Sequence, residues 1–188
     1  MMMKSVLSAL FFLFAISACT PSYTVDSIDS LSKKVGVVDY FEISRWHHYL
    51  MAQDSRLAVS AKAESSTHAT VLSKAIKASF AQYYADVTVF QVGASQPSLI
   101  SQARAQGYDF LLRAELLSAK PAPHPDEEGQ SYKHLKILIS VIDVNSEQMV
   151  DKILLSSNKS RIPFVRGQLD ELLREPLSAT AKELSGVE

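Results

Sequence analysis

The chain has only one cysteine, Cys19, and it lies near the amino terminus. A single thiol cannot form an internal disulfide, so the hydrophobic core must stabilise the fold without a covalent crosslink. Hydrophobic residues make up 47% of the 188 residues, which suits one domain with a substantial core. We therefore expect a single domain that is held together by packing alone.

Short motifs that mark common active sites are also missing. The sequence contains no G-x-S-x-G turn, no P-loop, no H-E-x-x-H and no C-x-x-C. No spacing identifies a serine nucleophile with its base. The sequence predicts a protein that is not an enzyme and that uses no cofactor and no metal.

An excess of positive charge is missing as well, because 19 Lys and Arg face 20 Asp and Glu. Proteins that bind nucleic acids usually carry a clustered basic surface. The sequence therefore predicts no nucleic-acid partner, and it shows no polybasic contact for anionic lipid.

The longest apolar run lies at the start of the chain, over residues 6–16, and follows the single charge of Lys4. Two small residues then precede Cys19. This order is typical of a secretory signal peptide, here residues 1–18. The run is too short for a membrane span, which needs about 20 apolar residues.

The block Ile16-Ser17-Ala18-Cys19 resembles the lipobox of bacterial lipoproteins, in which cleavage exposes a cysteine that becomes lipidated. The resemblance implies a diacylglyceryl group and an amide-linked acyl chain such as palmitate on Cys19, which together anchor a protein firmly. An ordinary signal peptide that ends near a cysteine is the alternative. The odd cysteine of an exported chain favours lipidation.

The second residue of the mature chain is Thr20, whereas aspartate there tends to retain similar Gram-negative lipoproteins at the inner membrane. The resemblance thus implies an outer-membrane lipoprotein whose domain faces the periplasm. Removing residues 1–18 leaves 170 residues and takes away Lys4, so the net charge changes from −1 to −2. Residues 19–34, rich in Ser, Thr and Asp, predict a flexible tether. Residues 35–188 predict a single periplasmic α/β domain.

Hydrophobic periodicity predicts a fold of the α/β or α+β class. We expect strands at residues 34–40, 56–60, 86–92, 108–116, 134–142 and 149–156. We expect helices at residues 66–84 and 97–107 and a helical segment from Gln168, which Pro176 breaks or kinks so that a further helix runs to about Leu184. The order indicates a single mixed sheet of about five to six strands, with two to three helices packed mainly on one face.

Two adjacent histidines, His47 and His48, are candidate metal ligands. Adjacent side chains point apart on a strand or a helix, so the pair cannot readily share a metal ion. We interpret them as a surface or loop pair.

The most unusual segment is rich in proline and acid. Alternating prolines favour an extended, exposed conformation, which makes the segment a candidate docking loop for a partner. The alternative, which the general exposure of loops favours, is a solvated hairpin loop whose prolines limit its entropy. The residues of the candidate docking loop are Pro121, Pro123, His124, Pro125, Asp126, Glu127 and Glu128. A small basic cluster, Lys159, Arg161 and Arg166, follows later and could meet an anion.

Four stretches stand in a recognisable order: ISAC, then GYDFLL at 107–112, KSR at 159–161 and DELLREPL at 170–177. Together they resemble an uncharacterised family of short Gram-negative lipoproteins, known only as a domain of unknown function. The similarity spans about Arg56 to Leu184. The chain departs from the family at 120–131, where the family pattern implies aromatic and acidic residues with a tryptophan. The resemblance implies no catalytic residues.

These observations predict a non-enzymatic accessory protein of the cell envelope, anchored in the outer membrane through Cys19, that binds another envelope protein. The alternative is a periplasmic lipoprotein that binds a small ligand in a pocket beside the sheet. A ligand binder should show a thermal shift with a compound, whereas an accessory protein should co-purify with a defined protein.

Overall fold

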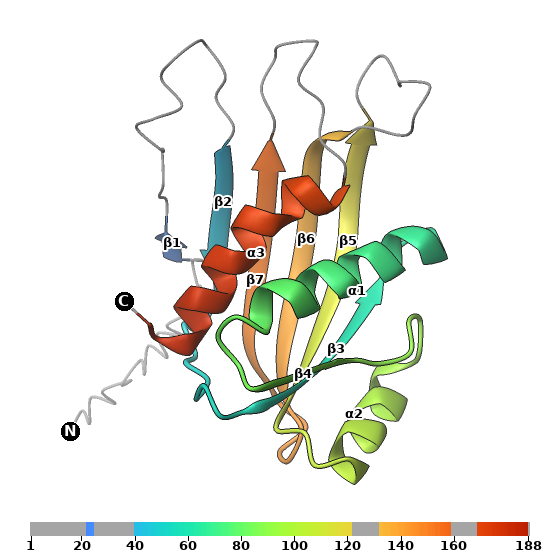
Figure 1. Cartoon of the computed structure of the whole chain (residues 1–188), viewed down its shortest axis with the longest axis vertical. Helices are drawn as coiled ribbons and strands as arrows, with labels where there is room; N and C mark the ends of the chain where they lie inside the picture. Colours follow the sequence, from blue (N-terminus) through green and yellow to red (C-terminus); the bar gives the residue numbers. More distant parts are fainter. Residues whose placement is uncertain (1–21, 25–39, 122–131, 159–168, 188) are drawn as a thin grey trace, which may run out of the picture.

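The computed structural model describes residues 22–24, 40–121, 132–158 and 169–187 (Figure 1). Within these ranges the chain forms seven strands and three helices. The strands are β1 (Ser22–Thr24), β2 (Tyr40–Arg45), β3 (Arg56–Lys62), β4 (Asp86–Val89), β5 (Phe110–Pro121), β6 (Tyr132–Asp143) and β7 (Met149–Asn158). The helices are α1 (Ser66–Phe80), α2 (Gln96–Ala105) and α3 (Leu169–Ser185).

All the described strands join one open sheet in the order β1-β2-β7-β6-β5-β3-β4. Strand β3 pairs in parallel with β4 and β5, and the other described pairs are antiparallel. The predicted mixed sheet with helices is therefore confirmed, as an α+β fold. Six of the described strands have four or more residues, as expected, and the three-residue β1 adds one more at the sheet edge.

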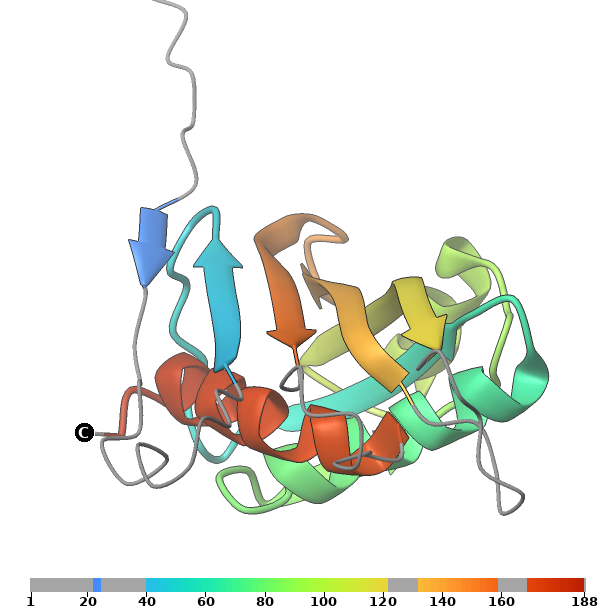
Figure 2. The same cartoon turned by 90° about the horizontal axis from the view of Figure 1, so that it is seen from above.

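Helices α1 and α3 cover one face of the sheet, and α2 lies on the other, as Figure 2 shows. The chain moves outward from β3 through α1 to β4, then returns through α2 past β3 to β5. Right-handed crossovers that run in opposite directions place their helices on opposite faces. The prediction that the helices pack mainly on one face agrees with this arrangement.

Successive residues of a strand point to opposite faces, so the apolar side chains divide between two cores. Leu57 and Leu112 belong to the larger core, beneath α1 and α3. Ala58 and Leu111, their neighbours in sequence, belong to the smaller core, where they pack with Leu99 and other residues of α2.

Helix α1 forms where its apolar spacing predicts it. Its N-cap is Ser65, whose side chain accepts a hydrogen bond from the backbone N–H of His68 at 3.1 Å. Leu72, Ile76 and Phe80, spaced four residues apart, form a fully buried stripe along the helix. The helix ends at Phe80, before the predicted end near residue 84.

Helix α3 corrects the prediction of a break at Pro176, because the helix is continuous through that residue. A proline inside a helix removes one backbone hydrogen bond and costs about 3 kcal/mol. Leu172, Leu173 and Leu177 are buried beside it, and each buried leucine contributes about 1.5–3 kcal/mol. The packing of this stripe offsets the cost, so one helix forms instead of two.

The first strand of the domain also differs from the prediction. The described strand is β2, whereas residues 34–39 of the predicted strand lie outside the described residues. Arg45 occupies an inward position of β2 and is 2% exposed. A charge at an inward position interrupts the apolar alternation that identifies a strand.

Part of the predicted tether forms a strand. Ser22–Thr24 pair with β2 in an antiparallel register that places Ser22 opposite Arg45. The other residues of the range 19–34 lie outside the described part of the chain.

Candidate binding surface

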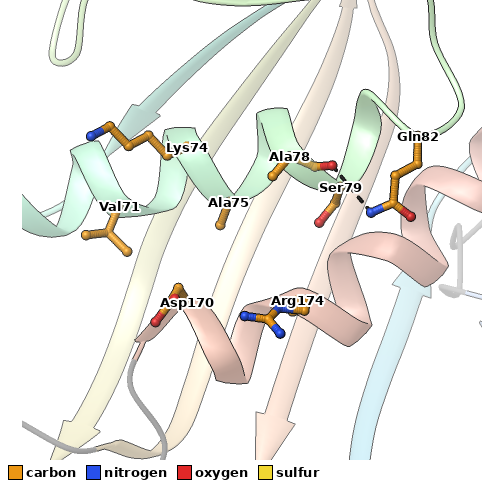
Figure 3. A pocket seen from close by; sticks show the side chains of 8 residues that line it. All are labelled: Val71, Lys74, Ala75, Ala78, Ser79, Gln82, Asp170 and Arg174. Atoms are coloured by element: carbon orange, nitrogen blue, oxygen red, sulfur yellow. Dashed lines mark hydrogen bonds between the residues drawn. The ribbon is translucent and has the colours of Figure 1, made fainter.

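A groove runs between α1 and α3 on the outer side of the helix layer (Figure 3). Its volume is about 520 Å³. Helix α1 contributes most of the lining and α3 contributes the opposite side. The lining residues are Val71, Lys74, Ala75, Ala78, Ser79 and Gln82 from α1 and Asp170 and Arg174 from α3.

Small side chains create the groove. Ala75, Ala78 and Ser79 fill little space on the side of α1 that faces α3, so the two helices leave room between them (Figure 3). The Gln82 amide reaches back to the backbone oxygen of Ala78 at 3.4 Å and closes one end of the lining. The result is a shallow surface with an apolar base and polar sides.

Two exposed cations and one carboxylate carry the charge of the groove. Lys74 comes from α1, and Arg174 and Asp170 come from α3. Neither Lys74 nor Arg174 forms an ion pair with any residue that the structure describes. Exposed cations beside an apolar base suit a peptide segment that carries both apolar and acidic side chains.

The sequence analysis missed this groove, although α1 carries a signal for it. Val71, Ala75, Ala78 and Gln82 recur at spacings of four, three and four residues, beside the buried stripe of the same helix. A second stripe of uncharged residues beside the buried one widens the apolar face of α1 and indicates a side that a neighbouring element lines. That element is α3, whose position along α1 only the tertiary fold defines.

The candidate docking loop lies almost entirely outside the described residues. Pro121 is the last residue of β5, whereas Pro123, His124, Pro125, Asp126, Glu127 and Glu128 fall in the range that the structure does not describe. The basic cluster of Lys159, Arg161 and Arg166 lies outside the described residues too.

Strand register nevertheless brings the starting points of these segments together. Asn158, where β7 ends, lies opposite both Tyr40 of β2 and His134 of β6. His134 also pairs with Lys120, next to the end of β5. Strands β5 and β7 therefore end at the same end of the sheet, and in sequence the acidic segment follows β5 and the basic segment follows β7.

A buried ion pair joins β2 to β7 at the opposite end of the sheet. Arg45 donates to Oδ2 of Asp151 through Nη2 at 2.7 Å and through Nε at 3.1 Å. The two side chains are 3% and 0% exposed. Arg45 also donates to the backbone oxygen of Tyr49 at 2.7 Å, and its Nη1 lies 3.6 Å from the Glu183 carboxylate on α3.

Backbone N–H groups satisfy the remaining lone pairs of Asp151. Oδ1 accepts hydrogen bonds from His47 at 3.1 Å and from Lys152 at 2.7 Å, and Oδ2 accepts one from Tyr49 at 3.1 Å. Burial would raise the pKa of Asp151, but the hydrogen bonds from Arg45, His47 and Lys152 outweigh it and lower the pKa below its ordinary value. Since no lone pair is left over, Asp151 fixes the loop of residues 46–50 rather than acting as a general base.

The Tyr84 hydroxyl is the one buried side-chain polar atom of the described residues that lacks a hydrogen-bond partner. Burial raises the pKa of Tyr84, and the charge of Arg45 opposes that effect. The ring stacks on Phe80, with 6.0 Å between ring centroids. Burial therefore keeps the phenol un-ionised at neutral pH.

Both predicted surface histidines are exposed and lie in the loop after β2. His48 has a left-handed backbone, with φ of 50°, as the tight bend of this loop requires. The residues that the structure describes contain no group of three or more His, Cys, Asp or Glu side chains that could hold a metal ion.

Cys19, the predicted lipidation site, lies outside the described residues. Among the helices that the structure describes, none combines the length and the apolar character that crossing a membrane requires.

Comparison with known proteins identifies one family. The model of a domain of unknown function (DUF4823) matches residues 48–184. This match confirms the predicted resemblance to a family known only as a domain of unknown function, and its span is close to the predicted one of Arg56 to Leu184. None of the curated proteins compared with this chain matches it.

Two solved structures of the PelC dodecamer from Paraburkholderia phytofirmans are similar to this chain. One is 15% identical, covers 77% of this chain and 97% of the PelC chain, and has a TM-score of 0.61. The other, a variant, is 16% identical, covers 76% and 97%, and has a TM-score of 0.58. Lipoprotein GNA1162 from Neisseria meningitidis is 9% identical, covers 70% of this chain and 99% of its own chain, and has a TM-score of only 0.41. At these identities the PelC structures show a shared fold, and the similarity to GNA1162 supports no conclusion.

Proposed function

This chain belongs to the family described as a domain of unknown function (DUF4823), and we propose that it is a non-enzymatic accessory lipoprotein of the Gram-negative cell envelope. In this proposal a lipid on Cys19 anchors the protein in the outer membrane, and the domain faces the periplasm. The domain binds a segment of another envelope protein in the groove between α1 and α3.

The groove is the observation that carries the proposal. It combines a base of small side chains with two exposed cations, Lys74 and Arg174, that make no ion pair within the described structure. A peptide with apolar anchors and acidic neighbours would bury the base and pair with the cations, as amphipathic segments do in helix-lined grooves. The similar PelC structures are dodecamers, so a second copy of this chain is one envelope partner to consider.

Two further features support the proposal. The apolar run before Cys19 and the block ISAC fit a lipoprotein signal peptide. The buried carboxylate of Asp151 accepts five hydrogen bonds, so no lone pair is left for use as a general base.

Binding of a small ligand is the second candidate function. The groove volume of about 520 Å³ lies within the range of about 300–1,000 Å³ that is common for ligand sites. A small ligand, however, needs a site that surrounds most of its surface, whereas this groove lies open between two helices. We therefore rank it below protein binding.

Site-specific photocrosslinking in living cells tests the proposal. A photoreactive amino acid replaces Ala78, which is exposed in the groove, and in a matched control it replaces Gln102, which is exposed on α2. We expect one abundant envelope protein to be crosslinked from position 78 and not from position 102. Equal crosslinking from both positions, or none from position 78, would contradict binding in the groove.

Charge reversal tests whether binding depends on the cations that line the groove or on the positive charge of the surface in general. Lys74→Glu combined with Arg174→Glu should abolish the crosslink from position 78. Lys77→Glu should leave it unchanged, because Lys77 is exposed on α1 but does not line the groove. The Cys19→Ala form, which should leave the membrane fraction, shows whether the interaction also requires the anchor.

A further inference from the structure

Exposed large apolar side chains gather at one end of the sheet. Five such residues are found in the described part of the chain, and four of them lie where β2 ends, where β7 begins, or at the end of α3. The four are Tyr49, Leu50, Met149 and Val187. The fifth, Leu117, lies on β5 toward the opposite end of the sheet.

Three of these residues lie on the side of the sheet that α3 covers and form what we call the end patch: Tyr49, Leu50 and Val187. Leu50 is 61% exposed, and its side chain lies against the Gly186 position, next to Val187. Tyr49 is 37% exposed while its ring makes an edge-to-face contact with Phe110 at 5.8 Å. The contact between Tyr49 and Phe110 and the Arg45–Asp151 ion pair thus fix the loop that carries Tyr49 and Leu50, so that both side chains stay at the surface.

The end patch lies beside the place from which the chain leads to its lipid anchor. Ser22, the first residue of β1, is opposite Arg45, whose guanidinium donates to the backbone oxygen of Tyr49. Cys19 precedes Ser22 by three residues, and three residues can span at most about 11 Å. A lipid on Cys19 therefore enters the membrane close to the end patch.

The chemistry of the end patch fits the boundary between headgroups and acyl chains. Tyrosine favours this boundary because it presents an apolar ring with a polar tip. At the same end of the sheet, but on its other face, the Lys152 ammonium lies 5.7 Å from the centroid of the Trp46 ring. Leu50 supplies the side chain that would insert most deeply, since it is the most exposed of the five.

We propose that the end patch is a membrane-contacting face, which seats the domain directly on the phospholipid surface beside its lipid anchor. This inference rests on the anchor of the proposed function. The lipid supplies the affinity for the membrane, and the end patch defines which end of the sheet faces it.

Quenching by brominated lipid tests the proposal, because Trp46 is the only tryptophan of the chain. The lipidated full-length protein, purified in detergent, is reconstituted into vesicles of phosphatidylethanolamine and phosphatidylglycerol with ordinary or dibrominated acyl chains. Two variants move the reporter: Trp46→Phe with Leu50→Trp, and Trp46→Phe with Leu117→Trp as the matched control. Leu117 is 50% exposed, so both reporters start at accessible positions.

We expect the reporter at position 50 to lose more than half of its emission in brominated vesicles, and the reporter at position 117 to keep its emission. Equal emission from position 50 in the two kinds of vesicle would overturn the proposal. A blue-shifted but unquenched reporter at position 50 would also overturn it, and would indicate that a protein or a second copy covers the end patch. Flotation with the vesicles is scored separately: protein that floats without quenching leaves the anchor standing, and protein that fails to float overturns both the anchor and this inference.

Discussion

The substitution Asp151→Asn should reveal how much the domain depends on its one buried ion pair among the described residues. The Asp151 carboxylate is fully buried and accepts two hydrogen bonds from Arg45 and three from the backbone N–H groups of His47, Tyr49 and Lys152. Asparagine has the same shape, but one of its two terminal atoms is a nitrogen that can only donate. At least two of these donors therefore lose their acceptor.

The expected loss is large because Arg45 keeps its charge. Its side chain is 3% exposed, and among the described residues the only other carboxylate paired with it is that of Glu183, at 3.6 Å. Removing one partner of a buried pair typically lowers the free energy of unfolding by about 3–5 kcal/mol. For a chain of this size that corresponds to a fall in Tm of about 6–20 °C.

Urea unfolding of the Cys19→Ala protein, followed by Trp46 fluorescence and by circular dichroism, measures this difference. Glu147→Gln is the matched control, because Glu147 pairs with Arg104 at 2.7 Å while both side chains are about half exposed. An exposed pair contributes less than about 1 kcal/mol. If Asp151→Asn lowers the free energy of unfolding no more than Glu147→Gln does, the role assigned to the buried pair is wrong.

Three further predictions follow from the same structure. The folded state lowers the pKa of Asp151, so the carboxylate's contribution to the free energy of unfolding is present above about pH 4 and is lost as the pH falls through the folded-state pKa. In acid titrations the free energy of unfolding should therefore fall less with decreasing pH in Asp151→Asn than in the wild type. Gly107→Ala should lower the free energy of unfolding by about 1 kcal/mol, because Gly107 has φ of +73° and a Cβ there would lie 3.1 Å from Nη1 of Arg56. An unchanged urea midpoint would count against this strain. Pro176→Ala should raise the free energy of unfolding by about 1–3 kcal/mol, because it restores a helical hydrogen bond. A lower thermal midpoint of the variant would instead show that packing of the buried proline ring stabilises the fold by more than the missing hydrogen bond costs.

The elements that could be predicted from sequence are those in which the apolar spacing and the residues that begin or end the element indicate the same structure. Leu72, Ile76 and Phe80 mark α1, and Gly107 ends the region of α2 in the left-handed conformation that favours glycine. The errors occur where tertiary contacts override the local signal. Arg45 occupies an inward position because Asp151, more than 100 residues away, pairs with it. Pro176 stays helical because the leucines around it are buried.

The groove and the end patch could not be read from sequence for a different reason. Lys74 and Arg174 look like ordinary exposed side chains of two amphipathic helices, and only the packing of α1 against α3 makes both residues line one groove. Similarly, Leu50 and Gly186 are distant in sequence, and the hydrogen bond from the backbone N–H of Met51 to the oxygen of Leu184, at 2.8 Å, brings them together. A sequence pattern defines the face of an element, but not the element that it will meet.

In the proposed lipoprotein the two ends of the sheet have different roles: one contacts the membrane, and the other leads to the candidate docking loop. Strand β6 has 12 residues and spans about 40 Å, so the end that carries the candidate docking loop lies far from the end patch. If the end patch rests on the outer membrane, the sheet holds the far ends of β5 and β7 away from the lipid. Pairing of β1 with β2 only three residues after Cys19 leaves little slack for the domain to move away from the membrane. A partner that binds at the far end of the sheet must therefore approach the domain from the periplasmic side.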